Sequence, residues 1–252
     1  MKIAVSGKGG VGKTTLSAGL IQSYADSGDV VYSIDADPDT SLGITLGIKE
    51  DKLDELVPLI DMKEVIEEKN KGGGVLVDLN PEIENVLNEY SLQIGNIKFL
   101  KMGGVKQGGS ACYCKENSFL QSLLNSLLLD KVEPVIIDMS AGIEHLTRGT
   151  ARGVDAILVV TEPTTTSVKT AGVVKKLAHD LGIDRVFIAG NKIRTKADRD
   201  FISDAFSEDE IIGMISFEEE LLSNAQKTGT VNKYSNIKGI KDIWKKLMGG
   251  EK

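Results

Sequence analysis

Short apolar runs alternate along the chain with longer segments in which apolar residues recur every three or four positions. The short runs predict buried strands at residues 2–6, 30–34, 97–102, 135–138, 155–161, 185–192 and 210–215. The longer segments predict helices at residues 13–25, 51–66, 162–181 and 237–248, with a further helix start near residue 118. Strands that alternate with helices are typical of an α/β fold, a doubly wound, mostly parallel sheet flanked by helices.

Composition narrows the possible classes of protein. With 252 residues, 41% of them hydrophobic, the chain can form one large core, so we expect a single domain over residues 1–252. The net charge of −7 argues against nucleic-acid binding, because neutralising phosphates supplies most of that affinity. No apolar run reaches the roughly 18 residues of a membrane span, and the chain opens directly into a strand. We therefore expect a cytoplasmic protein without a signal peptide.

The stretch S-G-K-G-G-V-G-K-T-T, residues 6–15, lies between the first predicted strand and helix. This context indicates a P-loop, in which backbone N–H groups and the helix N-terminus hold phosphate oxygens. Lys13 would reach the β- and γ-phosphates and the Thr14 hydroxyl would bind Mg²⁺. A glycine-rich turn without a ligand is the alternative, and it fits this context poorly. We expect a bound nucleoside triphosphate, with contacts from Gly9, Gly10, Val11, Gly12, Lys13, Thr14 and Thr15.

A second lysine, Lys8, stands at the start of the loop, where an ordinary P-loop does not need one. The signature K-G-G-V-G-K-T-T resembles that of the deviant Walker A, MinD-like ATPases. The resemblance implies that Lys8 reaches across a dimer interface to the nucleotide of the partner, and therefore that ATP controls a homodimer. The alternative is a solvated loop lysine.

Carboxylates stand where two predicted strands end, at the edge where α/β sheets bind ligands. Asp138 closes the strand 135–138 and is interpreted as the Walker B carboxylate, which contacts Mg²⁺ through water. Asp35, Asp37 and Asp39 follow the strand 30–34. The resemblance implies that Asp37 orients the attacking water and that Asp35 lies near Mg²⁺, with Asp39 as the second candidate for the water. A solvated turn is the alternative.

Asn191 and Lys192 are the polar pair that ends the predicted strand 185–192, and they are expected to bind nucleotide. The resemblance implies that Asn191 reads the adenine edge, whereas an Asn after a strand is otherwise simple turn chemistry. The guanine-specific pattern Asn-Lys-x-Asp fails because residue 194 is arginine, which favours ATP. The backbone of residues 216–218 is expected to approach the base.

The only two cysteines, Cys112 and Cys114, lie on a glycine-rich segment before a predicted helix. Thiolates select Zn²⁺, Cu(I) or Fe–S centres, and a tetrahedral site needs four of them. A symmetric dimer with this segment on its twofold axis would supply four sulfurs. Buried apolar cysteines, a strained local disulfide and a redox pair are the alternatives; we favour the interfacial metal site.

Taken together, Lys8, Lys13, the Asp35–Asp37 switch and the Cys112-x-Cys114 pair resemble the CooC-type nickel-insertion ATPases. This resemblance implies an ATP-dependent dimer that binds Zn²⁺ or Ni²⁺ between its subunits. Its client would be a nickel enzyme, carbon monoxide dehydrogenase or acetyl-CoA synthase. A MinD- or ParA-like positioning ATPase and an electron-transfer ATPase with an interfacial [4Fe–4S] cluster are the rival functions.

The last predicted helix, residues 237–248, is basic and amphipathic. Such a helix can lie on an acidic membrane surface. We favour the other interpretation, in which its apolar side packs on the sheet as the last helix of the domain.

Overall fold

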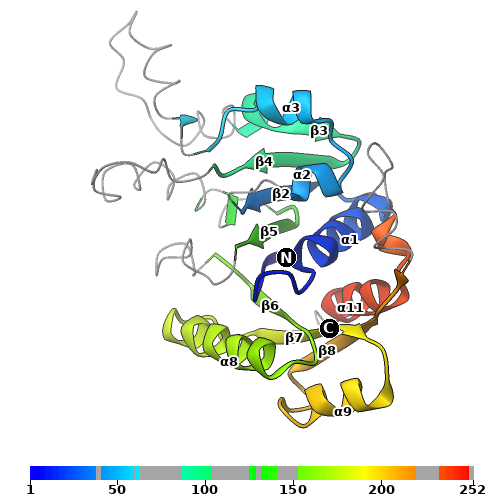
Figure 1. Ribbon diagram of the computed structural model, residues 1–252. Helices are drawn as coiled ribbons and strands as arrows, with labels where there is room; N and C mark the ends of the chain where they lie inside the picture. The colour runs from blue at the N-terminus through cyan, green and yellow to red at the C-terminus, as the bar shows by residue number, and fades with distance from the viewer. Residues whose placement is uncertain are drawn as a thin grey trace, which may run out of the picture.

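The computed structural model describes residues 1–37, 41–59, 61–62, 87–103, 125, 127–128, 132–140, 153–219 and 233–249. The strands are β1 (Lys2–Gly7), β2 (Val31–Ala36), β3 (Leu92–Ile94), β4 (Ile97–Lys101), β5 (Val135–Met139), β6 (Ala156–Thr161), β7 (Val186–Ile193) and β8 (Ile211–Ser216). They form one eight-stranded sheet in the order β3-β4-β2-β5-β1-β6-β7-β8 (Figure 1). Only the pairing of β3 with β4 is antiparallel; the other neighbours run parallel.

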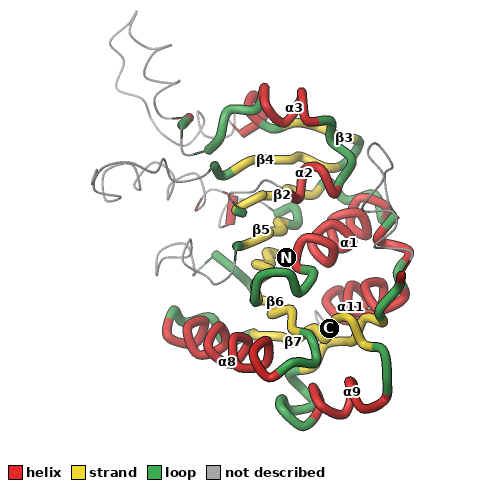
Figure 2. The backbone as a smooth tube through the Cα atoms, in the orientation of Figure 1, coloured by secondary structure: helices red, strands yellow, loops and turns green. Residues whose placement is uncertain are grey.

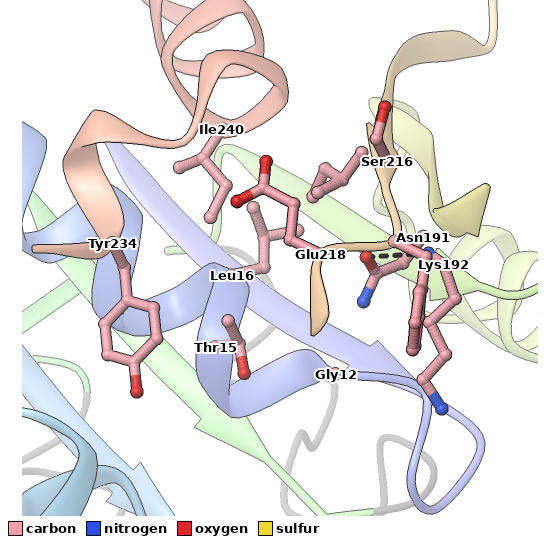
Figure 3. A pocket seen from close by; sticks show the side chains of 11 residues that line it. Gly12, Thr15, Leu16, Asn191, Lys192, Ser216, Glu218, Tyr234 and Ile240 are labelled. Atoms are coloured by element: carbon pink, nitrogen blue, oxygen red, sulfur yellow. Dashed lines mark hydrogen bonds between the residues drawn. The ribbon is translucent and has the colours of Figure 1, made fainter. Parts of the chain in front are cut away.

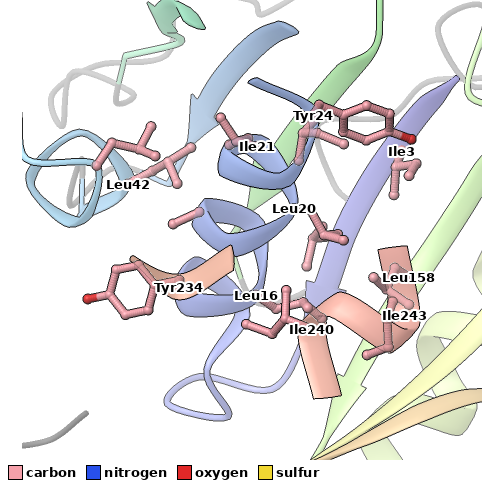
Figure 4. Close-up of a cluster of buried hydrophobic side chains, with 14 of the residues drawn as sticks. Ile3, Leu16, Leu20, Ile21, Tyr24, Leu42, Leu158, Tyr234, Ile240 and Ile243 are labelled. Carbon is pink, nitrogen blue, oxygen red and sulfur yellow. The ribbon is translucent and has the colours of Figure 1, made fainter. Parts of the chain in front are cut away.

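The helices are α1 (Lys13–Asp26), α2 (Ser41–Thr45), α3 (Glu50–Glu55), α8 (Thr165–Asp180), α9 (Lys196–Ser203) and α11 (Lys238–Gly249), with a 3-10 turn η2 (Tyr234–Asn236). Helices α1 and α11 lie on one side of the sheet and α8 lies on the other (Figure 2). On the first side, Leu16 and Leu20 of α1 share a buried apolar cluster with Ile240 and Ile243 of α11 (Figure 4). A sheet covered on both faces explains why β1, β2, β5 and β6 are almost entirely buried. The predicted doubly wound, mostly parallel fold is confirmed.

Helix α11 packs its apolar side against the sheet and α1, which is the interpretation that we favoured from its sequence. Its apolar residues Ile240, Ile243 and Leu247 are at most 1% exposed. The approach to α1 is close, because a Cβ placed on Gly19 would lie 2.8 Å from two side-chain atoms of Ile240. Within the described part of the chain, no helix is long and apolar enough to cross a membrane.

The prediction of one helix over residues 51–66 is wrong. Helix α3 ends at Glu55, and Leu56 is extended, with φ −73° and ψ 126°. Pro58 explains the early end, because a proline disfavours helical backbone at the residue before it and has no N–H to donate.

Four short elements of the described chain were missed: β3, α2, α9 and the 3-10 turn η2. Strand β3 forms a hairpin with β4 through Gly95 and Asn96, and Gly95 has a positive φ of 56°. A Gly-Asn pair between apolar residues is a hairpin signal. Helix α9 begins with a capping box between Thr195 and Asp198, which is also visible in the sequence.

Two predicted strands end later than expected, and both differences concern the site. Strand β2 continues through Asp35 to Ala36, so that Asp35 lies inside the sheet. Strand β7 continues past Asn191 to Ile193, and its register with β8 shifts between Gly190 and Ile193.

Candidate nucleotide-binding site

The phosphate loop leaves the middle of the sheet, since β1 lies between β5 and β6. Two glycines shape it. Gly7 has a φ of 144°, and a Cβ there would lie 2.3 Å from the Val160 carbonyl oxygen of β6. Gly12 caps α1 with a φ of 97°, and its Cβ would lie 2.2 Å from Nδ2 of Asn191. Any side chain at either position would force the loop away from its neighbours.

A buried acidic pair flanks the loop. Asp35 of β2 and Asp138 of β5 are register partners, and both are fully buried. The Ser17 hydroxyl donates to Oδ1 of Asp138 at 2.8 Å, whereas Oδ2 is buried with no hydrogen-bond partner among the described residues. Burial raises the pKa of Asp138 from 3.8 to about 6, against the hydrogen bonds from Ser17 and Thr14, which lower it.

Asp35 organises the segment that follows β2. Its carboxylate accepts the backbone N–H groups of Asp37 at 3.2 Å and Leu42 at 3.0 Å. Burial and then the nearby Asp138 charge raise the pKa of Asp35 from 3.8 to about 7. Asp37 is half-buried at the end of this strand, and Asp39 lies outside the described residues.

The two lysines of the loop point to different groups. The Lys13 side chain is 7% exposed, and its Nζ donates to the Lys8 carbonyl oxygen at 3.4 Å. The Lys8 ammonium instead donates to Oγ1 of Thr166, at 2.9 Å, in the first turn of α8. The Thr14 hydroxyl lies 3.4 Å from that of Ser41, at the start of α2. Lys8 thus connects the loop to α8, and Thr14 connects the start of α1 to α2.

Asn191 and Lys192 hold the loop from β7. Nδ2 of Asn191 donates to the Val11 carbonyl oxygen at 2.7 Å. Nζ of Lys192 donates to the Gly10 carbonyl oxygen at 2.7 Å and to a carboxylate oxygen of Glu162 at 2.9 Å. The backbone N–H of Lys192 donates to Oδ1 of Asn191, which fixes the orientation of that amide (Figure 3).

A cavity of about 150 Å³ opens beside the loop. Figure 3 shows it between the start of α1, which carries Leu16, and the segment that carries Ser216 and Glu218. Apolar and aromatic side chains from α1, β8, η2 and α11 line it, and Asn191 supplies an amide. A mostly apolar cavity with an amide in its lining suits a heteroaromatic base. The structure thus brings Asn191 and residues 216–218, which the sequence pointed to separately, to one cavity.

The predicted cysteine site is not among these residues, because Cys112 and Cys114 lie outside the described part of the chain. In the described ranges, no three or more His, Cys, Asp or Glu side chains gather closely enough to hold a metal ion.

Three residues of the site were missed from the sequence: Ser17, Glu162 and Thr166. Ser17 lies four residues after Lys13, so it shares a helix face with the loop lysine. Glu162 directly follows β6, at the carboxyl edge where polar side chains meet ligands. Those signals were available, but the partners of these side chains are distant in sequence.

Comparison with known proteins agrees with this geometry. The CobQ/CobB/MinD/ParA nucleotide binding domain matches residues 2–231. The chain is 38% identical over 224 residues to the carbon monoxide dehydrogenase accessory protein CooC of Rhodospirillum rubrum, covering 88% of this chain and 85% of that protein. It is also 38% identical to an uncharacterized ATP-binding protein of Methanocaldococcus jannaschii, covering 89% and 88%.

Solved structures show the same fold at low identity. The MinD of the MinC:MinD cell division complex of Aquifex aeolicus superposes with a TM-score of 0.70 at 22% identity, covering 98% of this chain and 95% of that one. MinD of Pyrococcus horikoshii, solved with Mg-ADP, superposes with a TM-score of 0.66 at 18% identity, covering 98% and 95%. The chain therefore belongs to the CobQ/CobB/MinD/ParA nucleotide-binding family and is an ATPase of that family.

Proposed function

We propose that this ATPase is a metallochaperone that delivers nickel to carbon monoxide dehydrogenase or to acetyl-CoA synthase. The observation that carries the proposal is the 38% identity to CooC across 88% of the chain. The Cys112-x-Cys114 pair supplies ligands that such cargo would need, because both cysteines of the chain stand together.

In this proposal the loop residues bind ATP with Mg²⁺. The residues present fit the ion: within the described part of the chain, Oδ2 of Asp138 is buried without a hydrogen-bond partner, and the Thr14 hydroxyl lies near this carboxylate. Thr14 and Asp138 would hold Mg²⁺, with Asp35 beside them, and the ion would neutralise charge on the phosphate oxygens. Lys13 approaches the same phosphates from the loop.

Asp37 positions the attacking water, with Asp39 as the second candidate. Support comes from Asp35, whose carboxylate accepts the backbone N–H of Asp37 and so fixes the backbone position of Asp37. Asn191 reads the adenine edge from the cavity beside Gly12. These assignments make the carboxyl edge of β2, β5 and β7 the nucleotide site.

Lys8 acts across a homodimer, on the nucleotide of the partner. In support, its ammonium contacts Thr166 on α8, and only Lys13 of the two lysines is buried within its own loop. ATP would close the dimer and hydrolysis would reopen it. Because two protomers supply four thiolates, closure and opening would alternately complete and distort a tetrahedral site, so that metal is held in one state and released in the other.

The test is metal content per dimer by elemental analysis of anaerobically purified protein, with and without ATP. The chain is compared with the Cys112→Ser/Cys114→Ser variant and with Lys13→Ala as a control that keeps both thiols. We expect one Zn²⁺ or Ni²⁺ per dimer, lost in the cysteine variant while nucleotide binding is kept. Stoichiometric metal in the cysteine variant would refute the site.

Two results would move the assignment elsewhere. Iron with acid-labile sulfide and a brown colour would indicate electron transfer through an interfacial cluster. No metal in any nucleotide state would leave a positioning switch of the MinD or ParA kind, which ATP-dependent sedimentation with liposomes would then reveal.

A further inference from the structure

Two consecutive carbonyl groups of the phosphate loop are held from outside by β7. Lys192 binds the carbonyl oxygen of Gly10, and Asn191 binds that of Val11, both at 2.7 Å. A trans peptide unit is planar, with its C=O and N–H pointing in opposite directions. Holding the Gly10 carbonyl therefore aims the N–H of Val11 to the other side of the loop. Converging N–H groups of this kind form a phosphate cradle.

Lys192 occupies an unusual backbone conformation to make this contact. Its φ is 58°, the only positive φ of a non-glycine residue in the described ranges. A lysine is strained there, whereas glycine or asparagine would be comfortable. The register of β7 with β8 shifts at this point, so the residue leaves the regular ladder. Backbone strain that persists at a site suggests that the strained residue has a functional role there.

Glu162 holds the lysine in place. It follows β6, a different strand from that of Lys192, and its carboxylate accepts from Nζ at 2.9 Å. The ammonium thus bridges β6 to the phosphate loop, with its charge partly balanced. The Lys192 and Glu162 side chains are 40% and 21% exposed, so ordinary solvation would satisfy both if nothing else were gained from the pairing.

We propose that Lys192 and Glu162 are positioning residues of the phosphate loop. Lys192 holds the Gly10 carbonyl, and Glu162 holds Lys192, so that the loop amides stay aimed at the triphosphate. The proposal rests on the assignment of residues 8–15 as the phosphate-binding loop. It gives Lys192 an indirect effect on phosphate affinity in place of a direct contact with nucleotide.

Glu162→Gln separates the two roles by the sign of its effect. If Lys192 contacted phosphate directly, removing a nearby negative charge and freeing the ammonium would strengthen anion binding. If Lys192 acts by holding the loop, losing Glu162 weakens its grip and weakens binding. The probe is inorganic tripolyphosphate with Mg²⁺, which has no base, alongside Mg-ATP.

Isothermal titration calorimetry on the full chain should show about tenfold weaker binding of both probes by Lys192→Gly, since a charge-assisted hydrogen bond is lost. Its melting temperature should stay within about 3 °C of the parent, because glycine relieves the strained backbone. Glu162→Gln should weaken both probes by roughly threefold to fivefold. Lys192→Arg should bind both probes as the parent does, because a guanidinium can reach both the Gly10 carbonyl oxygen and the Glu162 carboxylate.

Lys196→Ala is the matched control, because it removes one lysine charge just beyond β7, and this lysine forms an exposed ion pair with Asp200. Its affinities should equal those of the parent. Tighter or unchanged tripolyphosphate binding by Glu162→Gln would overturn the proposal. A Lys192→Gly protein that weakens for ATP but not for tripolyphosphate would also overturn it. A parent chain that binds neither probe would refute the phosphate-loop assignment itself.

Discussion

The buried contact between Ser17 and Asp138 allows a quantitative test of the acidic site. Oδ1 of Asp138 accepts the Ser17 hydroxyl at 2.8 Å, and no described residue forms a hydrogen bond with Oδ2. Ser17→Ala would leave a fully buried carboxylate with the Thr14 hydroxyl as its remaining side-chain donor. A hydrogen bond to a charged group contributes about 1.5–3 kcal/mol, so we expect the free energy of unfolding to fall by about 2 kcal/mol when Asp138 is ionised.

The effect should depend on pH with a definite sign. The pKa of Asp138 is raised to about 6 in the folded chain, above its ordinary value of 3.8, so its ionisation destabilises the fold as pH rises from about 4 through 6. The Ser17 hydroxyl lowers this pKa, and its removal enlarges the loss above that range. Below about pH 6, Asp138 is mostly protonated in the fold, so the lost bond is to a neutral carboxyl and should cost about 1 kcal/mol. The variant should therefore lose more stability at about pH 8 than at about pH 5.

Urea denaturation followed by circular dichroism, in the presence of a chelator, measures both values. Ser23→Ala is the matched control: its hydroxyl is also buried on α1, but it donates to the Gly19 carbonyl oxygen of its own helix. That variant should lose at most about 1 kcal/mol, equally at both pH values. A Ser17→Ala loss that does not grow with pH would show that the hydroxyl does not stabilise the ionised carboxylate.

Two further outcomes follow from the packing around the loop. Lys8→Ala should keep ATP affinity within about threefold, because the Lys8 ammonium contacts Thr166. The same variant should lose ATP-dependent dimerisation, measured by light scattering. A variant that dimerises normally would contradict the intermolecular role. Ile240→Ala should lower the free energy of unfolding, measured by denaturation, by about 2–5 kcal/mol, because a fully buried side chain is lost. Lys245→Ala, on the exposed side of α11, should lower it by under about 0.5 kcal/mol. Equal losses would place α11 outside the core.

The features that could be predicted from sequence are those with local patterns. The strand, glycine loop and helix at residues 2–26 are encoded by neighbours in the chain, and the apolar spacing of 237–248 predicted a packed helix. The end of α3 at Glu55 and the hairpin at Gly95 also have local causes, a proline and a Gly-Asn turn. Those two were missed although their signals were present.

The contacts that build the site could not be obtained in this way. Ser17 meets Asp138 across 121 residues of sequence, and Asn191 meets Val11 across 180. Which carboxylate receives a hydroxyl depends on the register of β2 and β5, and no residue pattern within either strand specifies that register. The φ of 58° at Lys192 likewise arises where β7 and β8 fall out of step.

The sequence by itself determined the class of fold, the phosphate loop and the carboxylates at strand ends, because periodicity and turn chemistry are properties of adjacent residues. The tertiary structure alone decided which side chains form hydrogen bonds and ion pairs with one another. Parallel strands bring their carboxyl ends to one edge regardless of their separation along the chain. At that edge, Glu162, Lys192 and the Gly10 carbonyl become neighbours, and the loop is held from β7.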